Sequence, residues 1–408
     1  MISTDGLDPA KISQINLGGA ELKANARQVL LGWASNPPFY ILNNGPPQVI
    51  VGRYGDVQEV FTDPVRFSSV VPRGKGYEQF DRFLGSQFIT QMDGEQHARL
   101  RRLLMSAFTP KRLAQLETRA VELISALLDR IEANGPEFDA MNHYGAQLVV
   151  AVLLTAMMNL DEDQRAAVLG FQEVQSLMTA MRPGDAFPQE VLDAHQRMAD
   201  VIQHLIDERR AKPHSDFLAD LVAARDEGDR LSDRELFDTI FGTAGALATL
   251  PRSSSGSIHM LYTHRDQLQQ VMDNPSLVPQ TVEECLRIAS NGYFTFPRVA
   301  TCDTQVGGTE IRKGMIVRPS PQAANYDPTV FTDPLKFDIH RNPKRIMSFG
   351  AGPHHCIGHA LGRMTLQIAL RSLITRFPKA HLVDPHFVPE YGGATGELRM
   401  KALPMRIA

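Results

Sequence analysis

The feature that most constrains this chain is a glycine-rich loop around a cysteine. Residues 349–358 read Phe-Gly-Ala-Gly-Pro-His-His-Cys-Ile-Gly. Gly350 and Gly352 allow tight turns that bring backbone N–H groups toward the sulfur of Cys356, because a residue without Cβ adopts backbone angles that others resist. Gly358 leaves room for a flat ligand to approach closely. The loop therefore predicts a cysteine thiolate that holds a metal ion.

A helical pattern follows the loop. Apolar residues recur at roughly helical spacing at Leu361, Met364, Ile368, Leu370, Leu373 and Phe377. Cys356 is thus expected near a helix N-terminus, where unpaired N–H groups and the helix dipole favour an anionic sulfur. A thiolate in such a position can push electron density into a haem iron and favour O–O cleavage.

Two alternative roles for cysteine stand beside this one. Most free cysteines are small buried hydrophobes, and we expect Cys285 and Cys302 to be of that kind. A zinc site is the rival for the loop, because Cys and His are the usual zinc ligands. Its candidate ligands are His354, His355, Cys356 and His359. Adjacent histidines rarely both reach one metal, and no second pair stands at ligand spacing, so we give zinc less weight.

The loop resembles the haem-binding signature of the cytochrome P450 monooxygenases at every fixed position. Those positions are Phe349, Gly350, Gly352, His354, Cys356 and Gly358. Other landmarks of that family occur in the expected order along nearly the whole chain. The resemblance implies the cytochrome P450 fold, mainly α with small β-sheets (α+β), an α-rich prism with a β-rich side region. It also implies haem b (iron protoporphyrin IX) as cofactor, with Cys356 as the axial ligand of the iron.

Composition favours one compact unit. A chain of 408 residues with 43% hydrophobic content can bury a large core, and no low-complexity linker or repeat divides it. We therefore expect a single cytochrome P450 domain over residues 1–408. About fifty residues follow the cysteine, too few for a fused flavin or iron–sulfur domain. We expect no fused reductase or ferredoxin domain, and electrons from a separate ferredoxin and its NAD(P)H-dependent reductase.

Charge and cysteine usage limit location and partners. The net charge of -4 argues against a nucleic-acid partner, and three widely separated cysteines suit a reducing cytosol. Charged residues interrupt the first forty positions before the ~20 apolar residues that a membrane span needs. They are Asp5, Asp8, Lys11, Glu21, Lys23 and Arg27. We expect a cytoplasmic, bacterial-type monomer without a membrane anchor.

Periodicity predicts mostly helices, with few and late strands. A strand is expected at Val49–Val51 and a short helix at Val57–Phe61. Helical patterns dominate from Gln96 to Met272, and strand patterns appear between Val299 and Val317. Helix breaks are expected near 134–136, 182–185 and 212–214. The middle break divides two helices that resemble the mobile lid of the family.

Haem carries two propionates, so its pocket needs fixed cations or hydrogen-bond donors, for which arginine's planar fork is well suited. The residues that match family positions are His97, Arg101, Arg298 and His354. His97 and Arg101 are one helical turn apart on one face. Taken alone, Arg101 fits equally a solvated basic face shared with Arg99 and Arg102.

An acid and a base stand at helical spacing at Glu284 and Arg287. Such pairs are usually surface salt bridges worth ~0–1 kcal/mol. In the resembled family they match a buried pair joined by an arginine that precedes the cysteine loop, here Arg341. The resemblance implies a structural role, in which the three residues hold the haem-side loop.

The oxygen side departs from the family pattern of a small residue, Gly, any residue, an acid and Thr. The corresponding stretch, residues 245–251, reads Gly-Ala-Leu-Ala-Thr-Leu-Pro. We assign the oxygen side to Gly245, Ala248 and Thr249, with Ala248 in place of the acid. A slip of one residue would put Ala248 at the threonine position, and neither register supplies an acid.

Two further points about this stretch stay open. The hydroxyl of Thr249 either handles oxygen or bonds back to the carbonyl of Gly245. Pro251 has no N–H for the carbonyl of Leu247, so we expect a kink whose freed carbonyl holds water and opens a proton path. Cleavage of dioxygen consumes protons, which positioned side chains or waters must deliver.

The resemblance also assigns an apolar substrate pocket. Its residues are Phe80, Phe83, Leu247, Phe294, Phe296 and Ala394. Such a pocket suits a small hydrophobic molecule. The implied activity is a monooxygenase that inserts one atom of O2 into that molecule. The missing acid keeps a hydrogen-peroxide-driven peroxygenase or an atypical oxidase as the alternative, and a non-catalytic haem-based ligand or gas sensor ranks below both.

Overall fold

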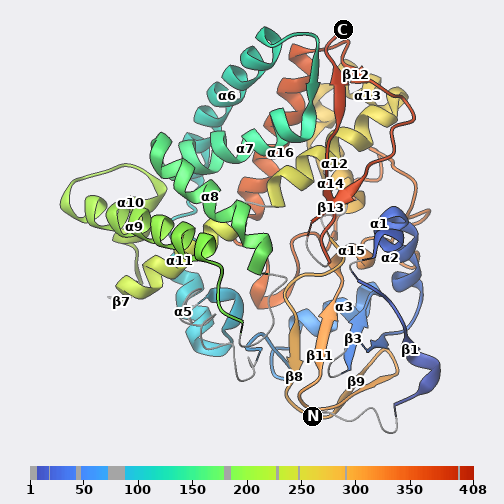
Figure 1. Cartoon of the computed structure of the whole chain (residues 1–408). Coiled ribbons are helices and arrows are strands. Elements are labelled where there is room, and N and C mark those ends of the chain that lie inside the picture. Colours follow the sequence, from blue (N-terminus) through green and yellow to red (C-terminus); the bar gives the residue numbers. More distant parts are fainter. Residues whose placement is uncertain are drawn as a thin grey trace. The chain divides into compact units, whose positions relative to one another are not determined.

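The structure is a computed structural model that describes residues 7–17, 19–42, 47–71, 88–178, 185–226, 229–246, 249–289, 292–393 and 396–408 (Figure 1). Its helices are η1 (Pro9–Lys11), α1 (Ala20–Ala24), α2 (Ala26–Ser35), α3 (Tyr54–Thr62), η2 (Ile89–Gln91), α5 (Gly94–Met105), α6 (Pro110–Ala133), η3 (Ala140–Gly145), α7 (Ala146–Leu148), η4 (Val149–Met157), α8 (Glu162–Met178), α9 (Gln189–Ala211), α10 (Phe217–Ala223), α11 (Asp233–Ala246), α12 (Thr249–Thr263), α13 (Arg265–Asp273), η5 (Pro275–Leu277), α14 (Val278–Ile288), α15 (Pro321–Ala324), η6 (Gly352–His354) and α16 (His359–Arg376). Of the η elements, η3 and η4 are π-helical and the others are 3-10 helices.

The strands are short. They are β1 (Ile12–Ser13), β2 (Phe39–Ile41), β3 (Gln48–Val51), β4 (Phe67–Ser68), β5 (Glu137–Asp139), β6 (Arg225–Asp226), β7 (Asp229–Arg230), β8 (Arg298–Ala300), β9 (Thr304–Val306), β10 (Thr309–Ile311), β11 (Ile316–Pro319), β12 (His381–Leu382), β13 (Tyr391–Gly392), β14 (Arg399–Met400) and β15 (Pro404–Arg406). The expectation of a mainly α protein with small sheets is confirmed.

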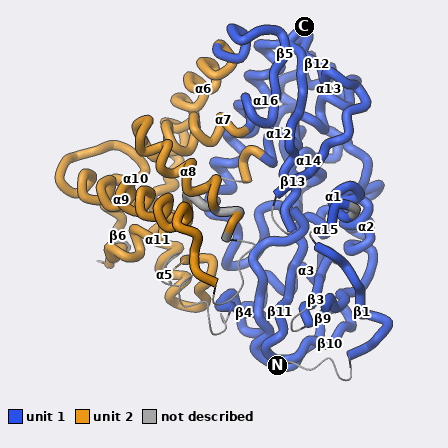
Figure 2. The backbone as a smooth tube through the Cα atoms, viewed as in Figure 1, with its two compact units in different colours: residues 1–71, 130–145, 252–408 blue, residues 72–129, 146–251 orange. Residues whose placement is uncertain are grey.

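The chain divides into two compact units (Figure 2). Unit 1 contains residues 1–71, 130–145 and 252–408, and unit 2 contains residues 72–129 and 146–251. The cysteine loop therefore belongs to unit 1, whereas α5 and α11 belong to unit 2.

The main sheet of unit 1 has six strands in the order β1-β2-β3-β11-β8-β4. β3 and β11 run parallel, and β8 pairs antiparallel with both β11 and β4. β-Branched residues such as Val49 and Val317 suit these strands and are fully buried against α3 residues Val57 and Val60. The sheet thereby fixes the position of β8, whose first residue is Arg298.

The helical part of unit 1 packs α14 against α16, the helix that follows the cysteine loop. Residues buried along α14 include Val282, Cys285 and Ile288, and those along α16 include Leu366 and Leu373. Burial of apolar side chains on both helices contributes ~1.5–3 kcal/mol for each large side chain. This packing holds the helix on which the cysteine loop depends.

Unit 2 is built on α9, which packs against α8, α10 and α11. His195 on α9 lies 6.0 Å from the Phe171 ring and 5.3 Å from the Phe241 ring, both measured between ring centroids. Gly242 allows the Phe88 ring to approach α11, because a Cβ there would lie 3.0 Å from that ring. Aromatic packing thus joins the helices of this unit.

Most element predictions are confirmed, and one is wrong in part. β3 and α3 cover the predicted strand at Val49–Val51 and helix at Val57–Phe61, and β8–β11 lie in the predicted strand region. The breaks near 134–136 and 212–214 fall between helices, whereas 182–184 lie outside the described residues. Strands are not only late, since β1, β2 and β4 precede α5; they are too short to show a period of two.

One described segment, Ala140–Met157, is long and apolar enough by composition to cross a membrane, with a mean hydropathy of 1.2 over 18 residues. Of that segment, 56% is buried inside the protein, as in the core helix of a folded domain.

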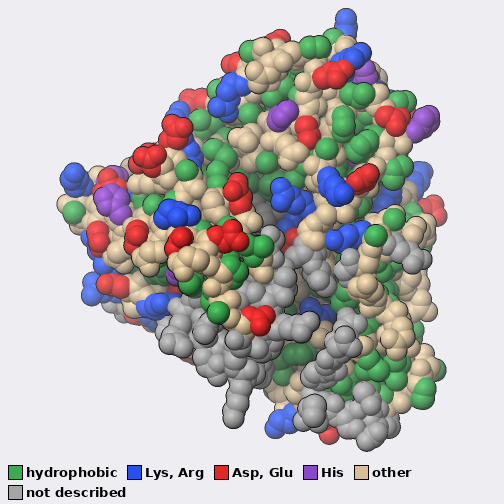
Figure 3. All heavy atoms as spheres, in the orientation of Figure 1, with side chains coloured by type: hydrophobic (Ala, Val, Ile, Leu, Met, Phe, Trp, Pro, Cys, Tyr) green, Lys and Arg blue, Asp and Glu red, His purple; other side chains and the backbone are tan. Residues whose placement is uncertain are grey.

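On the face drawn in Figure 3, acidic and basic side chains lie interspersed over α8–α11.

Candidate functional site

Backbone hydrogen bonds and two glycines at positive φ fix the conformation of the cysteine loop. The N–H of Cys356 donates to the carbonyl of Phe349 at 2.9 Å, and the N–H of Gly350 donates to Met347 at 2.8 Å. Gly350 and Gly352 have φ angles of +70° and +67°, in the left-handed region that favours glycine. Cys356 itself is exposed and shortly precedes α16, as the sequence predicts.

The ring of Phe349, at the start of the cysteine loop, packs against α16. The Arg363 guanidinium carbon lies 4.4 Å from the centre of the Phe349 ring. Arg363 also forms a bidentate pair with Glu283 on α14, through N–O distances of 2.6 and 3.1 Å. This contact ties the loop to both helices.

Glu284, Arg287 and Arg341 form one buried network. The side chains of Glu284 and Arg287 are both 0% exposed, and two hydrogen bonds of 2.8 and 2.7 Å join them. Arg341 Nε donates to Glu284 at 3.2 Å. Arg287 also donates to three backbone carbonyls of the chain before the loop, those of Asn325, Pro334 and Lys336. The network therefore holds the segment that leads into the cysteine loop.

The other predicted haem residues of unit 1 gather beside the loop. Arg298 is 4% exposed, donates to the carbonyls of Phe296 and Pro297, and lies over the Phe61 ring at 5.6 Å. Nε2 of His354 lies 2.9 Å from the hydroxyl of Ser69, a residue that no sequence motif marks. Only the register of β4 against β8 could have indicated it.

The predicted haem residues of unit 2 lie on α5. His97 is buried and Arg101 is half-buried on the same helical face. Arg99 instead pairs with Asp229 and Glu235, and this contact raises its pKa above the usual value. Arg102 pairs with exposed Glu95. Arg99 and Arg102 are thus each paired with acidic side chains, and Arg101 is less exposed than Arg102.

The oxygen-side residues lie at the junction of α11 and α12. Gly245 is near the end of α11, and Thr249 is the exposed first residue of α12. Ala248 and Leu247 lie outside the described residues. Pro251 stands in the first turn of α12, where proline is tolerated because the N–H groups there have no partner within the helix.

Two predicted substrate residues, Phe294 and Phe296, fall within the described chain. The ring of Phe294 stacks on that of Trp33 at 5.2 Å between centroids. The guanidinium carbon of Arg318 lies over the Phe294 ring, 5.7 Å from its centre. Phe296 is 55% exposed. The remaining predictions, Phe80, Phe83, Leu247 and Ala394, lie outside the described residues.

The alternative roles for cysteine are resolved by burial and grouping. Cys285 is buried, and burial raises the pKa of its thiol well above the usual value, as expected of a small core residue. The prediction for Cys302 is wrong, because it is exposed in the loop between β8 and β9. Within the described ranges, no group of three or more His, Cys, Asp or Glu side chains is arranged to hold a metal ion, which disfavours zinc.

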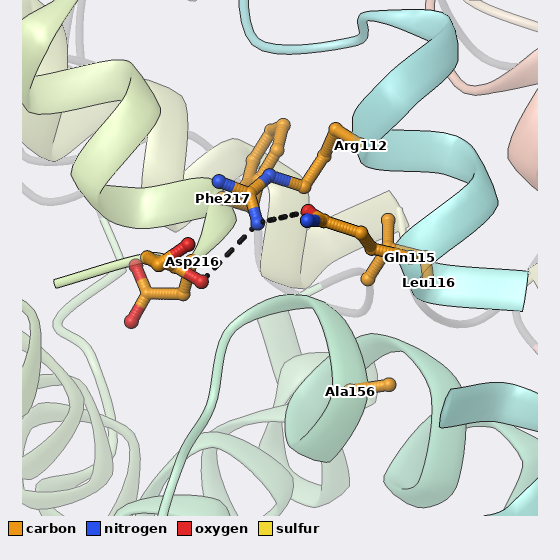
Figure 4. A pocket seen from close by; sticks show the side chains of 7 residues that line it. Arg112, Gln115, Leu116, Ala156, Asp216 and Phe217 are labelled. Atoms are coloured by element: carbon orange, nitrogen blue, oxygen red, sulfur yellow. Dashed lines mark hydrogen bonds between the residues drawn. The ribbon is translucent and has the colours of Figure 1, made fainter. Parts of the chain in front are cut away.

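A small pocket in unit 2 lies apart in sequence from all these residues (Figure 4). Its volume is about 190 Å³, and Arg112, Gln115, Asp216 and Phe217 line it. Arg112 is already engaged, because it donates to Asp220, Gln115 and the carbonyl of Ser215. Its charge is therefore neutralised locally, and we assign the pocket no function.

Unit 1 has the groups that a haem requires. A Cβ added at Gly358 would meet only the Cys356 sulfur, at 4.0 Å, so the space beside the sulfur is open to a flat ring. Arg298, His354 and Ser69 supply guanidinium, imidazole and hydroxyl groups, which suit carboxylate partners. These residues fit a haem with a thiolate ligand.

An α-rich fold with an exposed cysteine in a hydrogen-bonded loop before a long helix is the arrangement that a haem-thiolate protein needs. Comparison with known proteins agrees. The family model described as Cytochrome P450 matches residues 36–393. The chain belongs to the cytochrome P450 family.

Curated relatives include Nocardicin C N-oxygenase of Nocardia uniformis subsp. tsuyamanensis, 35% identical over 83% of this chain and 85% of that protein. Mycinamicin IV hydroxylase/epoxidase of Micromonospora griseorubida is 33% identical over 86% of this chain and 94% of its own. Among solved structures, the LnmA cytochrome P450 hydroxylase of Streptomyces atroolivaceus S-140 superposes with a TM-score of 0.81, at 29% identity, covering 99% of this chain and 98% of that one. The cytochrome P450 fold is thus confirmed, and the protein is an oxidoreductase of the cytochrome P450 monooxygenase class.

Proposed function

We propose that this protein inserts one oxygen atom from O2 into a small hydrophobic molecule, with electrons from a separate ferredoxin and its NAD(P)H-dependent reductase. The observation that carries the proposal is the exposed Cys356 in a hydrogen-bonded loop before α16. Haem b, when bound through this thiolate, supplies the O–O cleavage chemistry. We further propose a single-domain, cytoplasmic monomer.

In this proposal the predicted haem residues bind and orient the cofactor. Cys356 holds the iron, and Phe349, Gly350 and Gly358 shape the loop around the sulfur. Arg298 and His354 bind the propionates, as do His97 and Arg101 on α5. Their guanidinium and imidazole groups are donors, and charge-assisted bonds to carboxylates are about twice as strong as neutral ones. Glu284, Arg287 and Arg341 keep the preceding segment in place.

On the oxygen side, we assign Thr249 to position oxygen or a water, together with Gly245 and Ala248 of the same stretch of sequence. The residue directly before Thr249 is Ala248 and not an acid. We propose that a water near Pro251, in the first turn of α12, delivers the protons that dioxygen cleavage consumes. The variants Pro251→Ala and Ala248→Glu test this path, since the first removes the proline and the second restores an acid.

We expect Pro251→Ala to lower the amount of product formed per NAD(P)H oxidised by about 100-fold, the lower end of what a positioned proton donor contributes. Ala248→Glu in the Pro251→Ala background should restore this coupling. Unchanged coupling and rate in Pro251→Ala would show that the water path is wrong.

The absent acid favours one second candidate, a peroxygenase driven by hydrogen peroxide. The two are distinguished with a substrate chosen by spectral titration against fatty acids, steroids and macrolides. The monooxygenase forms isotopically labelled product from labelled O2 only with the complete electron-transfer chain. The peroxygenase forms the same product from hydrogen peroxide alone, at a rate at least equal to that of the complete chain.

For the substrate we propose a small hydrophobic molecule that contacts Phe80, Phe83, Leu247, Phe294, Phe296 and Ala394. The named relatives include a nocardicin N-oxygenase and a mycinamicin hydroxylase, which supports a natural-product type of substrate. Phe296 is the described residue best placed for contact, because it is 55% exposed although aromatic. A Phe296→Ala variant with unchanged affinity for the selected compound would remove it from the pocket.

A further inference from the structure

A buried serine lies among the residues proposed to bind the propionates. Ser69 directly follows β4 and is 2% exposed. In the antiparallel register of β4 and β8, Phe67 pairs with Ala300 and Ser68 with Val299. The next residue along, Ser69, therefore stands opposite Arg298. The hydroxyl of Ser69 lies 2.9 Å from Nε2 of His354.

We infer that Ser69 is a positioning residue, whose hydroxyl fixes the rotation and tautomer of the His354 imidazole for binding a haem propionate. A neutral imidazole donates from one nitrogen and accepts at the other. When the hydroxyl donates to Nε2, the proton resides on Nδ1, which becomes the nitrogen that donates to the carboxylate. The inference rests on the proposed role of His354 toward the haem.

The backbone around this contact is held from several directions. Gly352 begins η6 and packs so closely on α3 that a Cβ would lie 2.3 Å from the carbonyl oxygen of Phe61. The ring of Phe61 lies beneath the Arg298 guanidinium at 5.6 Å. Phe61 thus fixes both the segment that carries His354 and the arginine, and Ser69 completes this arrangement from the neighbouring strand.

Ligand-holding imidazoles commonly have their second nitrogen fixed by such a partner, and loss of that partner weakens binding without removing the ligand-holding group. The Ser69 hydroxyl is buried, so the contact is protected from competing water. A methyl group at this position leaves the imidazole to rotate and to exchange tautomers. The effect should appear in haem retention, and not only in turnover.

The test compares Ser69→Ala, Ser69→Thr, His354→Ala and the double variant Ser69→Ala/His354→Ala. The control is Ser68→Ala, because Ser68 is the adjacent residue, at the end of β4, and its hydroxyl accepts from the N–H of Val70. The readouts are the rate of haem transfer from the ferric holoprotein to excess apomyoglobin and the haem reduction potential. If Ser69→Ala does not retain haem, Ser69→Cys, which keeps a weak donor of similar size, replaces it.

We expect Ser69→Ala to release haem about 3- to 10-fold faster, the worth of one hydrogen bond. Ser69→Thr and Ser68→Ala should match the parent, and Ser69→Ala should add nothing in the His354→Ala background. Parent-like release from Ser69→Ala, or equal acceleration in the His354→Ala background, would overturn the inference. Parent-like haem release from His354→Ala would instead overturn the proposed role of His354. A parent protein without the thiolate-haem spectrum would overturn the proposed role of Cys356.

Discussion

Replacement of Arg287 tests whether the buried network holds the segment before the cysteine loop. Arg287→Met removes a cation whose side chain is 0% exposed and which donates to Glu284 and to three carbonyls. Breaking a buried ion pair costs ~3–5 kcal/mol. The carbonyls of Asn325 and Pro334 also lose this donor, at ~1–3 kcal/mol each when buried. Together these contributions give an expected loss of about 5–11 kcal/mol, comparable with the whole stability of many domains.

Two milder variants keep the prediction measurable if Arg287→Met does not fold. Arg287→Lys keeps the charge but lacks the planar fork that reaches several acceptors, so we expect a loss of about 2–4 kcal/mol. Arg341→Met removes the 3.2 Å contact with Glu284 and the hydrogen bonds to the carbonyls of Thr332, Asp333 and Lys336, from a residue whose side chain is 13% exposed. Its expected cost is about 1–2 kcal/mol.

The assay is urea unfolding followed by circular dichroism, with haem content measured on the same samples. The losses should follow the order Arg287→Met, Arg287→Lys, Arg341→Met. A free energy of unfolding for Arg287→Met within about 1 kcal/mol of the parent value would refute the reasoning. If the network holds the loop, removal of one partner from the buried pair must destabilise the protein by more than that.

Two further predictions concern stability. Gly352→Ala places a Cβ 2.3 Å from the Phe61 carbonyl, whereas a Cβ at Gly308, also at positive φ, would meet nothing within 4 Å. In urea unfolding, we expect the free energy of unfolding to fall by about 3 kcal/mol or more in Gly352→Ala and by about 1 kcal/mol in Gly308→Ala. Equal losses in the two variants would contradict the close approach of Gly352 to α3. Burial lowers the pKa of His259 from 6.5, so the unfolded chain binds a proton that the folded protein does not, and stability falls as the pH drops below that value. Urea unfolding between about pH 7.5 and 5.5 should show a shallower decline for His259→Gln than for the parent or for a variant of the exposed His204 on α9, His204→Gln. An unchanged slope would show that His259 does not contribute.

Sequence motifs predicted the parts of the site that depend on local chemistry. The spacing of Glu284 and Arg287 and the glycines around Cys356 act through neighbouring residues, so they are visible in the chain. Ser69 acts through a strand pairing and a contact with His354, far away in sequence. A lone serine carries no such pattern, and only the fold identifies it.

The wrong predictions, for Cys302 and for the early strands, each have a structural cause. Cys302 lies in a tight connection between β8 and β9, where the side chain faces solvent, so the general tendency of cysteine to be buried misleads. β1 and β4 contain only residue pairs, too short for periodicity to reveal them. Their pairing is decided by the long sheet around β3 and β11, which no local pattern encodes.

The central claim is that Cys356 is the thiolate ligand of a haem iron. The most direct measurement is the absorption spectrum of the dithionite-reduced, carbon monoxide-treated protein, compared with that of Cys356→Ser and of Cys302→Ser, the other exposed cysteine. We predict the thiolate-haem band in the parent and in Cys302→Ser, and its loss in Cys356→Ser. A parent without this band, or a Cys356→Ser protein that keeps it, would contradict the account.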